Sequence, residues 1–201
     1  SRAAEVAIGG IRDGFPSVMV DGSSLPFDEN VAITLEVVKT ARVFDVDVEA
    51  ELGHVGIGSN LDDITNTAHY TSVEDAVKFV ELTGCDSLAI AVGNAHGAYV
   101  RTPNLDFDRI AAIRRAIDIP LVMHGCSDIP DEQIRKAINL GMSKFNIATE
   151  YDRAYYTFSK ELYEAGLPRI SGFGAIKGIE DRMVDFVASK IRLLNPNGFS
   201  I

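Results

Sequence analysis

The chain has 201 residues, of which 46% are hydrophobic and 24% are charged, and these values are typical of one globular domain with a sizeable core. Its formal charge of −10 at pH 7 disfavours nucleic acid and anionic membranes as partners, because both carry negative charge. Two cysteines without metal-type spacing argue against a disulfide framework and indicate a cytoplasmic location. Neither a membrane-spanning apolar run nor a signal peptide is recognisable in the sequence.

Short apolar runs rich in β-branched residues alternate with segments of helical periodicity. The predicted strands cover residues 17–20, 46–51, 87–92, 121–123 and 144–148. A helix with apolar residues three and four positions apart is predicted between the first two strands, from about Val31 to Ala41. The segment 56–67 is rich in Gly, Ser, Asn and Asp and lacks periodicity, which predicts a mobile loop.

The later helices carry recognisable start and stop signals. One begins at the capping residue Ser72, which Asp75 follows three positions on, and ends at Gly84. Another has Pro130 in its first turn and ends at Gly141. A long helix is predicted over residues 179–194.

Strands that alternate with helices predict a parallel sheet in an α/β fold. A doubly wound open sheet and a (β/α)8 TIM barrel share this alternation. The first strand lacks a Gly-x-Gly-x-x-Gly turn, which disfavours the doubly wound dinucleotide fold. A polar residue of a catalytic type accompanies each predicted strand end, which favours a barrel, whose active site lies at the carboxyl ends. We predict that residues 1–201 form a single domain with about five strand–helix units of a (β/α)8 barrel.

The polar residues at these strand ends are expected to converge on one mouth: Asp21, Glu51, His96, His124 and Asn146. Two imidazoles and two carboxylates that approach one point suit a divalent metal. A lone histidine at a strand end is more often a hydrogen-bonded structural residue, and the two acids could be ordinary rim residues. However, Gly follows both histidines and lets the backbone approach a ligand closely, which favours function.

Small and hydroxyl residues follow the last two predicted strands. The fourth strand runs into His124-Gly125-Cys126-Ser127 and the fifth into Asn146-Ile147-Ala148-Thr149. Barrels often bind phosphate in the loops after their last strands, with backbone N–H groups and hydroxyls. The alternative is ordinary turn and helix-cap chemistry. Cys126 is interpreted as a small packing residue, and His54 and His69 as solvent-facing residues without a role.

Five motifs in this order resemble class II fructose-bisphosphate and tagatose-bisphosphate aldolases, with the tagatose type closer: Ser17–Phe27, Val48–Gly53, Gly93–Tyr99, Leu121–Ser127 and Asn146–Glu150. The resemblance implies a (β/α)8 barrel in which His96 and His124 bind zinc. It implies a second cation, monovalent or divalent, at Asp21 and Glu51 in some members. It also implies a site for dihydroxyacetone phosphate, formed by Gly97, Gly125, Cys126, Ser127, Asn146, Ile147, Ala148 and Thr149.

The implied activity is that of a lyase: reversible aldol cleavage of a ketose phosphate or bisphosphate to dihydroxyacetone phosphate and an aldehyde. Zinc polarises the substrate ketone and stabilises an enediolate, which adds to the aldehyde in the reverse direction. The resemblance further implies a cytoplasmic enzyme of carbohydrate metabolism, such as glycolysis, that forms homo-dimers or homo-tetramers.

The sequence departs from the family pattern in three places. The third zinc histidine and the catalytic aspartate of the family precede the matched region, so we expect about three further strand–helix units before Ser1, and the catalytic acid is not assigned. The loop lacks the family's glutamate, and Asp62 and Asp63 are the nearest candidates for its role in proton transfer. Ala148, and Val100 where many relatives have Lys, disfavour fructose 1,6-bisphosphate as the substrate. The alternatives are a non-catalytic or truncated relative that keeps phosphate binding, and another metal-dependent barrel enzyme such as an isomerase or epimerase.

Overall fold

Five parallel strands form one sheet in the order β1-β2-β3-β4-β5. The computed structural model describes residues 2–166, 172–195 and 198. The strands are β1 (Ser17–Val20), β2 (Asp47–Leu52), β3 (Ser87–Ile90), β4 (Leu121–Met123) and β5 (Met142–Phe145). Strand order that follows chain order, without the reversal of a doubly wound sheet, confirms the predicted partial (β/α)8 barrel.

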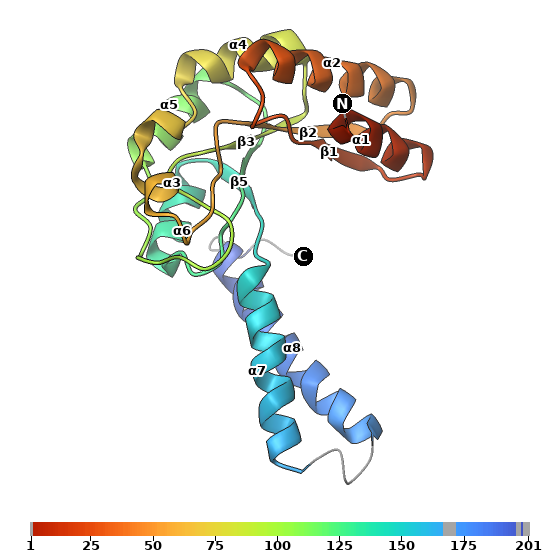
Figure 1. Ribbon diagram of the computed structural model, residues 1–201, viewed down its shortest axis with the longest axis vertical. Coiled ribbons are helices and arrows are strands. Elements are labelled where there is room, and N and C mark those ends of the chain that lie inside the picture. The colour runs from red at the N-terminus through yellow and green to blue at the C-terminus, as the bar shows by residue number, and fades with distance from the viewer. Residues whose placement is uncertain (1, 167–171, 196–197, 199–201) are drawn as a thin grey trace.

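Helices cover the outer, convex side of the curved sheet (Figure 1). They are α1 (Arg2–Arg12), α2 (Phe27–Val43), α4 (Val73–Thr83), α5 (Phe107–Ala116) and α6 (Asp131–Asn139), and two further helices, α7 (Thr149–Glu164) and α8 (Gly172–Leu194), follow β5. A short α3 (Leu61–Thr65) and the 3-10 helix η1 (Thr67–His69) lie between β2 and α4. None of the helices in the described ranges is long and apolar enough to cross a membrane.

The two faces of the sheet differ in chemistry. Side chains alternate between the faces along a strand, and paired residues of neighbouring parallel strands share a face. The residues that face the helices join one buried hydrophobic core with helix residues such as Phe79 and Ile110, and they include Val48, Leu88 and Leu121. The opposite, concave face carries the row of paired residues Glu51, Ala89, Val122 and Lys144. The concave side therefore carries the charged residues Glu51 and Lys144, in contrast to the apolar side under the helices.

Local signals place the ends of α4 as predicted. The Ser72 hydroxyl accepts the N–H of Asp75 at 3.0 Å, and Gly84 ends the helix in the left-handed region with φ +64°. The segment predicted as a loop over 56–67 contains the short helix α3, because Asn60 caps its first turn by accepting the N–H of Asp62 at 3.1 Å. This local side-chain bond is not visible as hydrophobic periodicity.

The last elements differ most from the predicted ranges. Strand β5 ends at Phe145, three residues before the predicted end, although the Asn146 N–H still donates to the Met123 carbonyl oxygen at 3.0 Å. Helix α8 begins at Gly172 rather than at residue 179. Its early turns contain glycines, and at Gly178 an added Cβ would lie 3.3 Å from the Leu162 side chain. Close packing against α7 therefore extends a segment whose own helix propensity is low. The pair α7 and α8 projects away from the sheet (Figure 1).

Candidate active site

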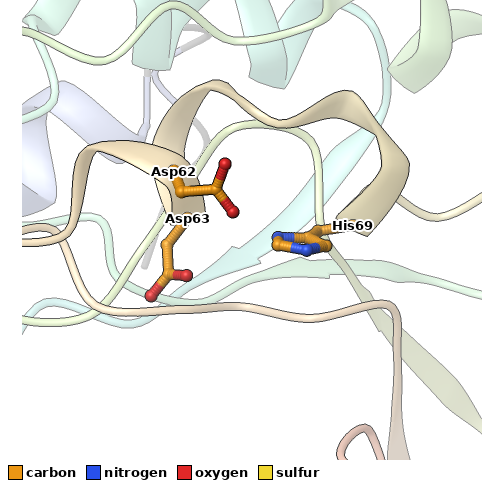
Figure 2. Close-up of side chains that lie close together, drawn as sticks. All are labelled: Asp62, Asp63 and His69. Atoms are coloured by element: carbon orange, nitrogen blue, oxygen red, sulfur yellow. The ribbon is translucent and has the colours of Figure 1, made fainter.

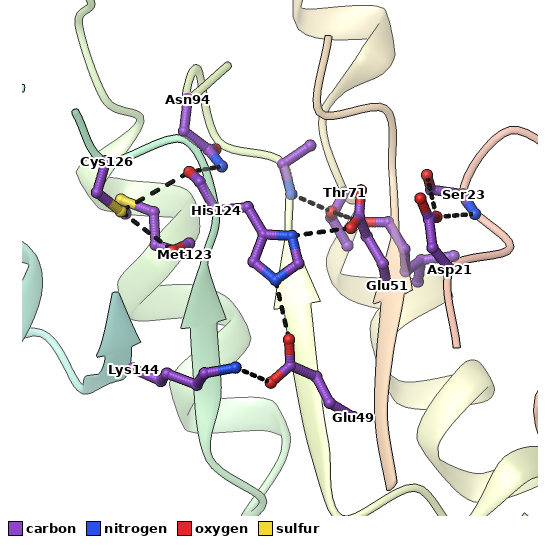
Figure 3. A network of polar contacts seen from close by, with 12 residues as sticks. Asp21, Ser23, Glu49, Glu51, Thr71, Asn94, Met123, His124, Cys126 and Lys144 are labelled. Atoms are coloured by element: carbon purple, nitrogen blue, oxygen red, sulfur yellow. Dashed lines mark hydrogen bonds and ion pairs between the residues drawn. The ribbon is translucent and has the colours of Figure 1, made fainter. Parts of the chain in front are cut away.

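His124, which directly follows β4, has a carboxylate at each ring nitrogen (Figure 3). Its Nε2 lies 2.9 Å from Glu49 Oε1, and its Nδ1 lies 3.0 Å from Glu51 Oε2. The other oxygen of Glu49 accepts a hydrogen bond from Lys144 Nζ at 2.6 Å. His124, Glu49 and Glu51 are all buried, with exposures of 4%, 5% and 2%. Together with Lys144 they are named here the carboxylate–histidine cluster. Glu49 and Glu51 lie on β2, His124 follows β4, and Lys144 lies on β5.

The alternation of side chains explains why these residues meet. Glu49 and Glu51 are two positions apart on β2 and therefore point to the same concave face. On β3, which lies between β2 and β4, the partner of Glu51 is Ala89. Because a methyl group occupies little space, the β2 carboxylates can reach across β3 to the imidazole on the far side.

The mutual contacts govern the charge states in the cluster. Burial alone would lower the pKa of His124, but the hydrogen bonds to Glu49 and Glu51 outweigh it and raise the pKa to about 9. Burial would raise the pKa of Glu49, yet the hydrogen bonds from His124 and Lys144 hold the Glu49 pKa below its ordinary value. At neutral pH the metal-free cluster therefore contains an imidazolium between two carboxylates.

Side-chain hydrogen bonds connect the loop after β3 to the loop after β4, and these two loops carry the two predicted zinc histidines. The ring centroids of His96 and His124 are 6.0 Å apart. The Asn94 side chain donates to the His124 carbonyl oxygen at 2.9 Å. The Tyr99 hydroxyl accepts the Ala95 N–H and donates to the Gly125 carbonyl oxygen, both at 2.8 Å. The imidazole positions thus depend on both loops together.

Of the four predicted metal ligands, the structure brings two into contact and a third nearby, although the donor atoms of these three do not all lie within 4.8 Å of one another. Glu51 contacts His124 directly, and the exposed His96 lies beside it, whereas the exposed Asp21 carboxylate accepts from the backbone N–H and hydroxyl of Ser23 at 2.9 and 2.7 Å. The 3.0 Å between His124 Nδ1 and Glu51 Oε2 is close to the roughly 3.3 Å between two donors on one tetrahedral ion with bonds of about 2.0 Å. Imidazole and carboxylate donors at this spacing fit zinc.

The predicted phosphate-binding residues lie together at the start of α7. The buried Ser127 hydroxyl accepts the Glu150 N–H at 3.1 Å, and the Cys126 N–H donates to the Asn146 carbonyl oxygen at 3.0 Å. Cys126 is buried, and burial raises the pKa of its thiol to about 12, in line with a packing role. Among the other predicted residues, Asn146 and Ala148 are exposed, Gly97, Gly125 and Thr149 are half-buried, and Ile147 packs against the core.

The loop acids belong to a second group of possible metal ligands. Asp62, Asp63 and His69 place possible ligand atoms within 4.8 Å of one another, the sole group of three such residues among those the structure describes (Figure 2). Asp63 Oδ2 accepts the Ile57 N–H at 2.7 Å, and this bond holds the loop. His69 is half-buried rather than solvent-facing, and its Nδ1 is buried without a hydrogen-bond partner among the described residues.

Sequence reasoning did not find Glu49 and Lys144. Both carried a usable signal, since Glu49 shares the strand face of Glu51, and Lys144 is a charged residue within a strand. Charged residues at such positions are costly to bury unless they are paired. Their pairing depends on the register of β2, β4 and β5, which the sequence pattern alone did not supply.

Comparison with known proteins identifies the family. Residues 2–198 match the family described as Fructose-bisphosphate aldolase class-II. The chain belongs to this class II aldolase family. The structure is similar to that of the YdjI aldolase from Escherichia coli K12, with a TM-score of 0.83 and 35% identity over 98% of this chain and 68% of that chain. The family thus agrees with the resemblance found in the sequence motifs.

Two further solved structures support the fold of this aldolase-family chain. A putative fructose-1,6-bisphosphate aldolase from Coccidioides immitis has a TM-score of 0.77 and 29% identity, over 98% of this chain and 67% of that one. The fructose-bisphosphate aldolase from Campylobacter jejuni has a TM-score of 0.76 and 22% identity, over 96% and 65%, and shows the likeness in fold alone. The chain therefore spans about two thirds of each relative's length.

Proposed function

We propose that this chain forms part of a zinc-dependent lyase that catalyses reversible aldol cleavage of a ketose phosphate to dihydroxyacetone phosphate and an aldehyde. The single observation that carries the proposal is the approach of His96 to the buried pair of His124 and Glu51 at the carboxyl ends of adjacent strands. Family membership supports the aldolase class, and the donor set supports the metal.

The metal would be held by His96, His124 and Glu51. Zinc bound there would act as a Lewis acid on the ketone oxygen of the substrate. The chain's own contribution is to bury two of these donors and to orient them through Glu49 and the fastened loops. Low exposure also excludes water from the donors, which strengthens electrostatic interactions in the site.

The phosphate group would bind where the β4 and β5 loops meet α7. The backbone N–H groups near Gly125 and the amino-terminal turn of α7 at Thr149 offer donors to an anion. The hydroxyl of Ser127 accepts from Glu150 and can donate its own hydrogen to a phosphate oxygen. Such local donors are needed because the net charge of −10 repels anions.

A proton must be moved during the reaction, and the loop acids differ in their suitability. The Asp63 carboxylate accepts hydrogen bonds from the Ile57 N–H and from the Asn60 side chain, whereas the Asp62 side chain is exposed. We therefore assign Asp62 as the better candidate for proton transfer within this chain. An Asp62→Asn substitution would lower turnover of the ketose phosphate without removing zinc.

The decisive experiment measures zinc content by mass spectrometry and the release of dihydroxyacetone phosphate from a panel of ketose phosphates. The wild-type protein should hold one zinc per chain, and His124→Ala should lose both the zinc and the activity. His69→Ala is the matched control, because it removes a histidine from the loop group of Figure 2 while leaving the proposed ligands intact. Stoichiometric zinc in His124→Ala, or its loss in His69→Ala alone, would overturn the assignment. Zinc binding without turnover of any ketose phosphate would favour a non-catalytic relative.

A further inference from the structure

The two carboxylates that contact His124 are not equivalent. Glu49 also forms an ion pair with Lys144, whose Nζ lies 2.6 Å from Glu49 Oε2. In the described part of the chain, the Glu51 side chain has His124 as its only hydrogen-bond or ion-pair partner. Glu49 is thus fixed from two sides, whereas Glu51 can exchange its partner without leaving another charge unpaired.

The two carboxylates also lie at different depths. Glu51 is two residues nearer the carboxyl end of β2 than Glu49, and that end faces the mouth of the barrel. The Nδ1 side of the imidazole therefore faces the mouth, while Nε2 faces inward to Glu49. Figure 3 shows the ring held between the two acids, with Lys144 at the other oxygen of Glu49.

A neutral imidazole carries one N–H and one lone pair, so it can donate to only one of these carboxylates. Glu49 is the better placed of the two carboxylates to keep the hydrogen bond from the imidazole. Without that bond, the buried Glu49 charge would have Lys144 as its remaining partner. Donation from Nε2 to Glu49 leaves the lone pair of Nδ1 directed at the mouth. The ring cannot present both nitrogens outward without breaking the contact to Glu49.

We propose that Glu49, held in place by Lys144, is a positioning residue that fixes the Nε2–H tautomer of His124 and so selects Nδ1 as its metal-binding nitrogen. The metal in this statement rests on the proposed function, but the tautomer does not. A carboxylate that orients a ligating histidine in this way typically changes metal affinity about 10- to 100-fold when it is removed.

The test is to determine which ring nitrogen of His124 carries hydrogen, by long-range ¹H–¹⁵N NMR. Spectra are recorded on the metal-free protein at alkaline pH and on the protein after addition of zinc. Affinity for the Zn²⁺ ion alone is measured by competition with a chelator. In the wild type we expect hydrogen on Nε2 in both states, and a zinc-induced shift at Nδ1.

Three variants separate positioning from general structural support. Glu49→Leu should mix the tautomers and weaken zinc binding about 10- to 100-fold. Glu49→Gln should preserve the tautomer and most of the affinity, because the amide oxygen still accepts from Nε2–H. Lys144→Met should fall between them, while Lys177→Met, which breaks only the exposed pair with Asp181, should match the wild type. If Glu49→Leu does not fold, the Gln and Met variants still decide the question.

Each outcome addresses one statement. Zinc bound through Nε2, or unchanged tautomer and affinity in Glu49→Leu and Lys144→Met, would overturn the positioning role. A wild-type protein that keeps hydrogen on Nε2 but binds no zinc would overturn the proposed function and support the positioning role.

Discussion

The carbonyl oxygen of Ala95 lies so close to Gly125 that a Cβ atom added at Gly125 would be 2.1 Å from it. Gly125 follows His124, and Ala95 precedes His96, so this contact sets the separation between the two loops that carry the imidazoles. The atom in the way belongs to the backbone and cannot be moved by a change of rotamer. The sequence His-Gly after β4 thus serves the approach of the loops, in addition to any approach of a ligand.

A Gly125→Ala substitution should destabilise the protein by about 3 kcal/mol or more, because a steric clash adds to an unfavourable backbone conformation. The matched control is Gly84→Ala, since Gly84 has φ +64° against +63° for Gly125 but nothing within 4 Å of its added Cβ. The control should lose only about 1–2 kcal/mol. Urea denaturation of both variants measures the difference, and equal losses would contradict the steric argument.

The Tyr99 hydroxyl links the same two loops through hydrogen bonds. A Tyr99→Phe substitution leaves the Ala95 N–H and the Gly125 carbonyl oxygen without this partner, and we expect a loss of about 1–3 kcal/mol. The control is Tyr70→Phe, which removes one longer bond of 3.3 Å to the Ile64 carbonyl oxygen. Thermal unfolding of the two variants provides the comparison, and a larger effect at Tyr70 would contradict the proposed fastening.

The sequence was sufficient to predict the partial barrel, because its strands and helices follow local patterns. Alternation of strands and helices, and polar residues at strand ends, can be recognised without tertiary contacts. The capping bond of Ser72 was predicted for the same reason. The partial barrel and the family are confirmed, while the metal-binding roles of His96, His124, Asp21 and Glu51 stay predictions.

What the sequence did not reveal depends on strand register. Glu49 and Lys144 are 95 positions apart, and their contact requires four strands to pair in one alignment. Strand β5 ends at Phe145, which pairs with Met123, the last residue of β4, and propensity does not encode this limit set by the partner strand. The short helix α3 was missed because capping by Asn60, rather than an apolar stripe, defines it.

The loop between β2 and α4 should depend on Asp63 more than on Asp62. Asp63 accepts the Ile57 N–H at 2.7 Å and contacts Asn60, whereas the Asp62 carboxylate contacts only Asn66, at 3.3 and 3.4 Å, among the described residues. An Asp63→Ala substitution should lower hydrogen-exchange protection of the Ile57 amide about tenfold, which corresponds to a bond of roughly 1.4 kcal/mol.

Asp62→Ala should leave protection of the Ile57 amide within about twofold of wild type. Exchange is followed by amide NMR at one pH, so that intrinsic rates cancel between the variants. A similar loss of protection in both variants would show that negative charge in the loop, rather than the Asp63 hydrogen bond, holds the segment.

Stability of the metal-free protein should fall as pH rises from neutral to alkaline. The pKa of His124 is raised from the ordinary 6.5 to about 9, so the folded state binds this proton more tightly than the unfolded state. The stabilisation is therefore complete below pH 6.5 and is lost as the pH rises to about 9. This stabilisation is at most about 3.5 kcal/mol, at roughly 1.4 kcal/mol for each pH unit between the two pKa values.

Glu49 has the opposite sign, because its pKa is lowered from 4.5 in the folded state. Its contribution is complete above pH 4.5 and is lost as the pH falls through the lowered pKa, so stability should be greatest between about pH 4.5 and 6.5. Urea titrations from about pH 2 to 10 in the presence of a chelator measure both limbs. His124→Gln should flatten the alkaline limb, because the titrating imidazole is absent. Stability that stays constant or rises between pH 7 and 9 in the wild type would contradict an imidazolium held between Glu49 and Glu51.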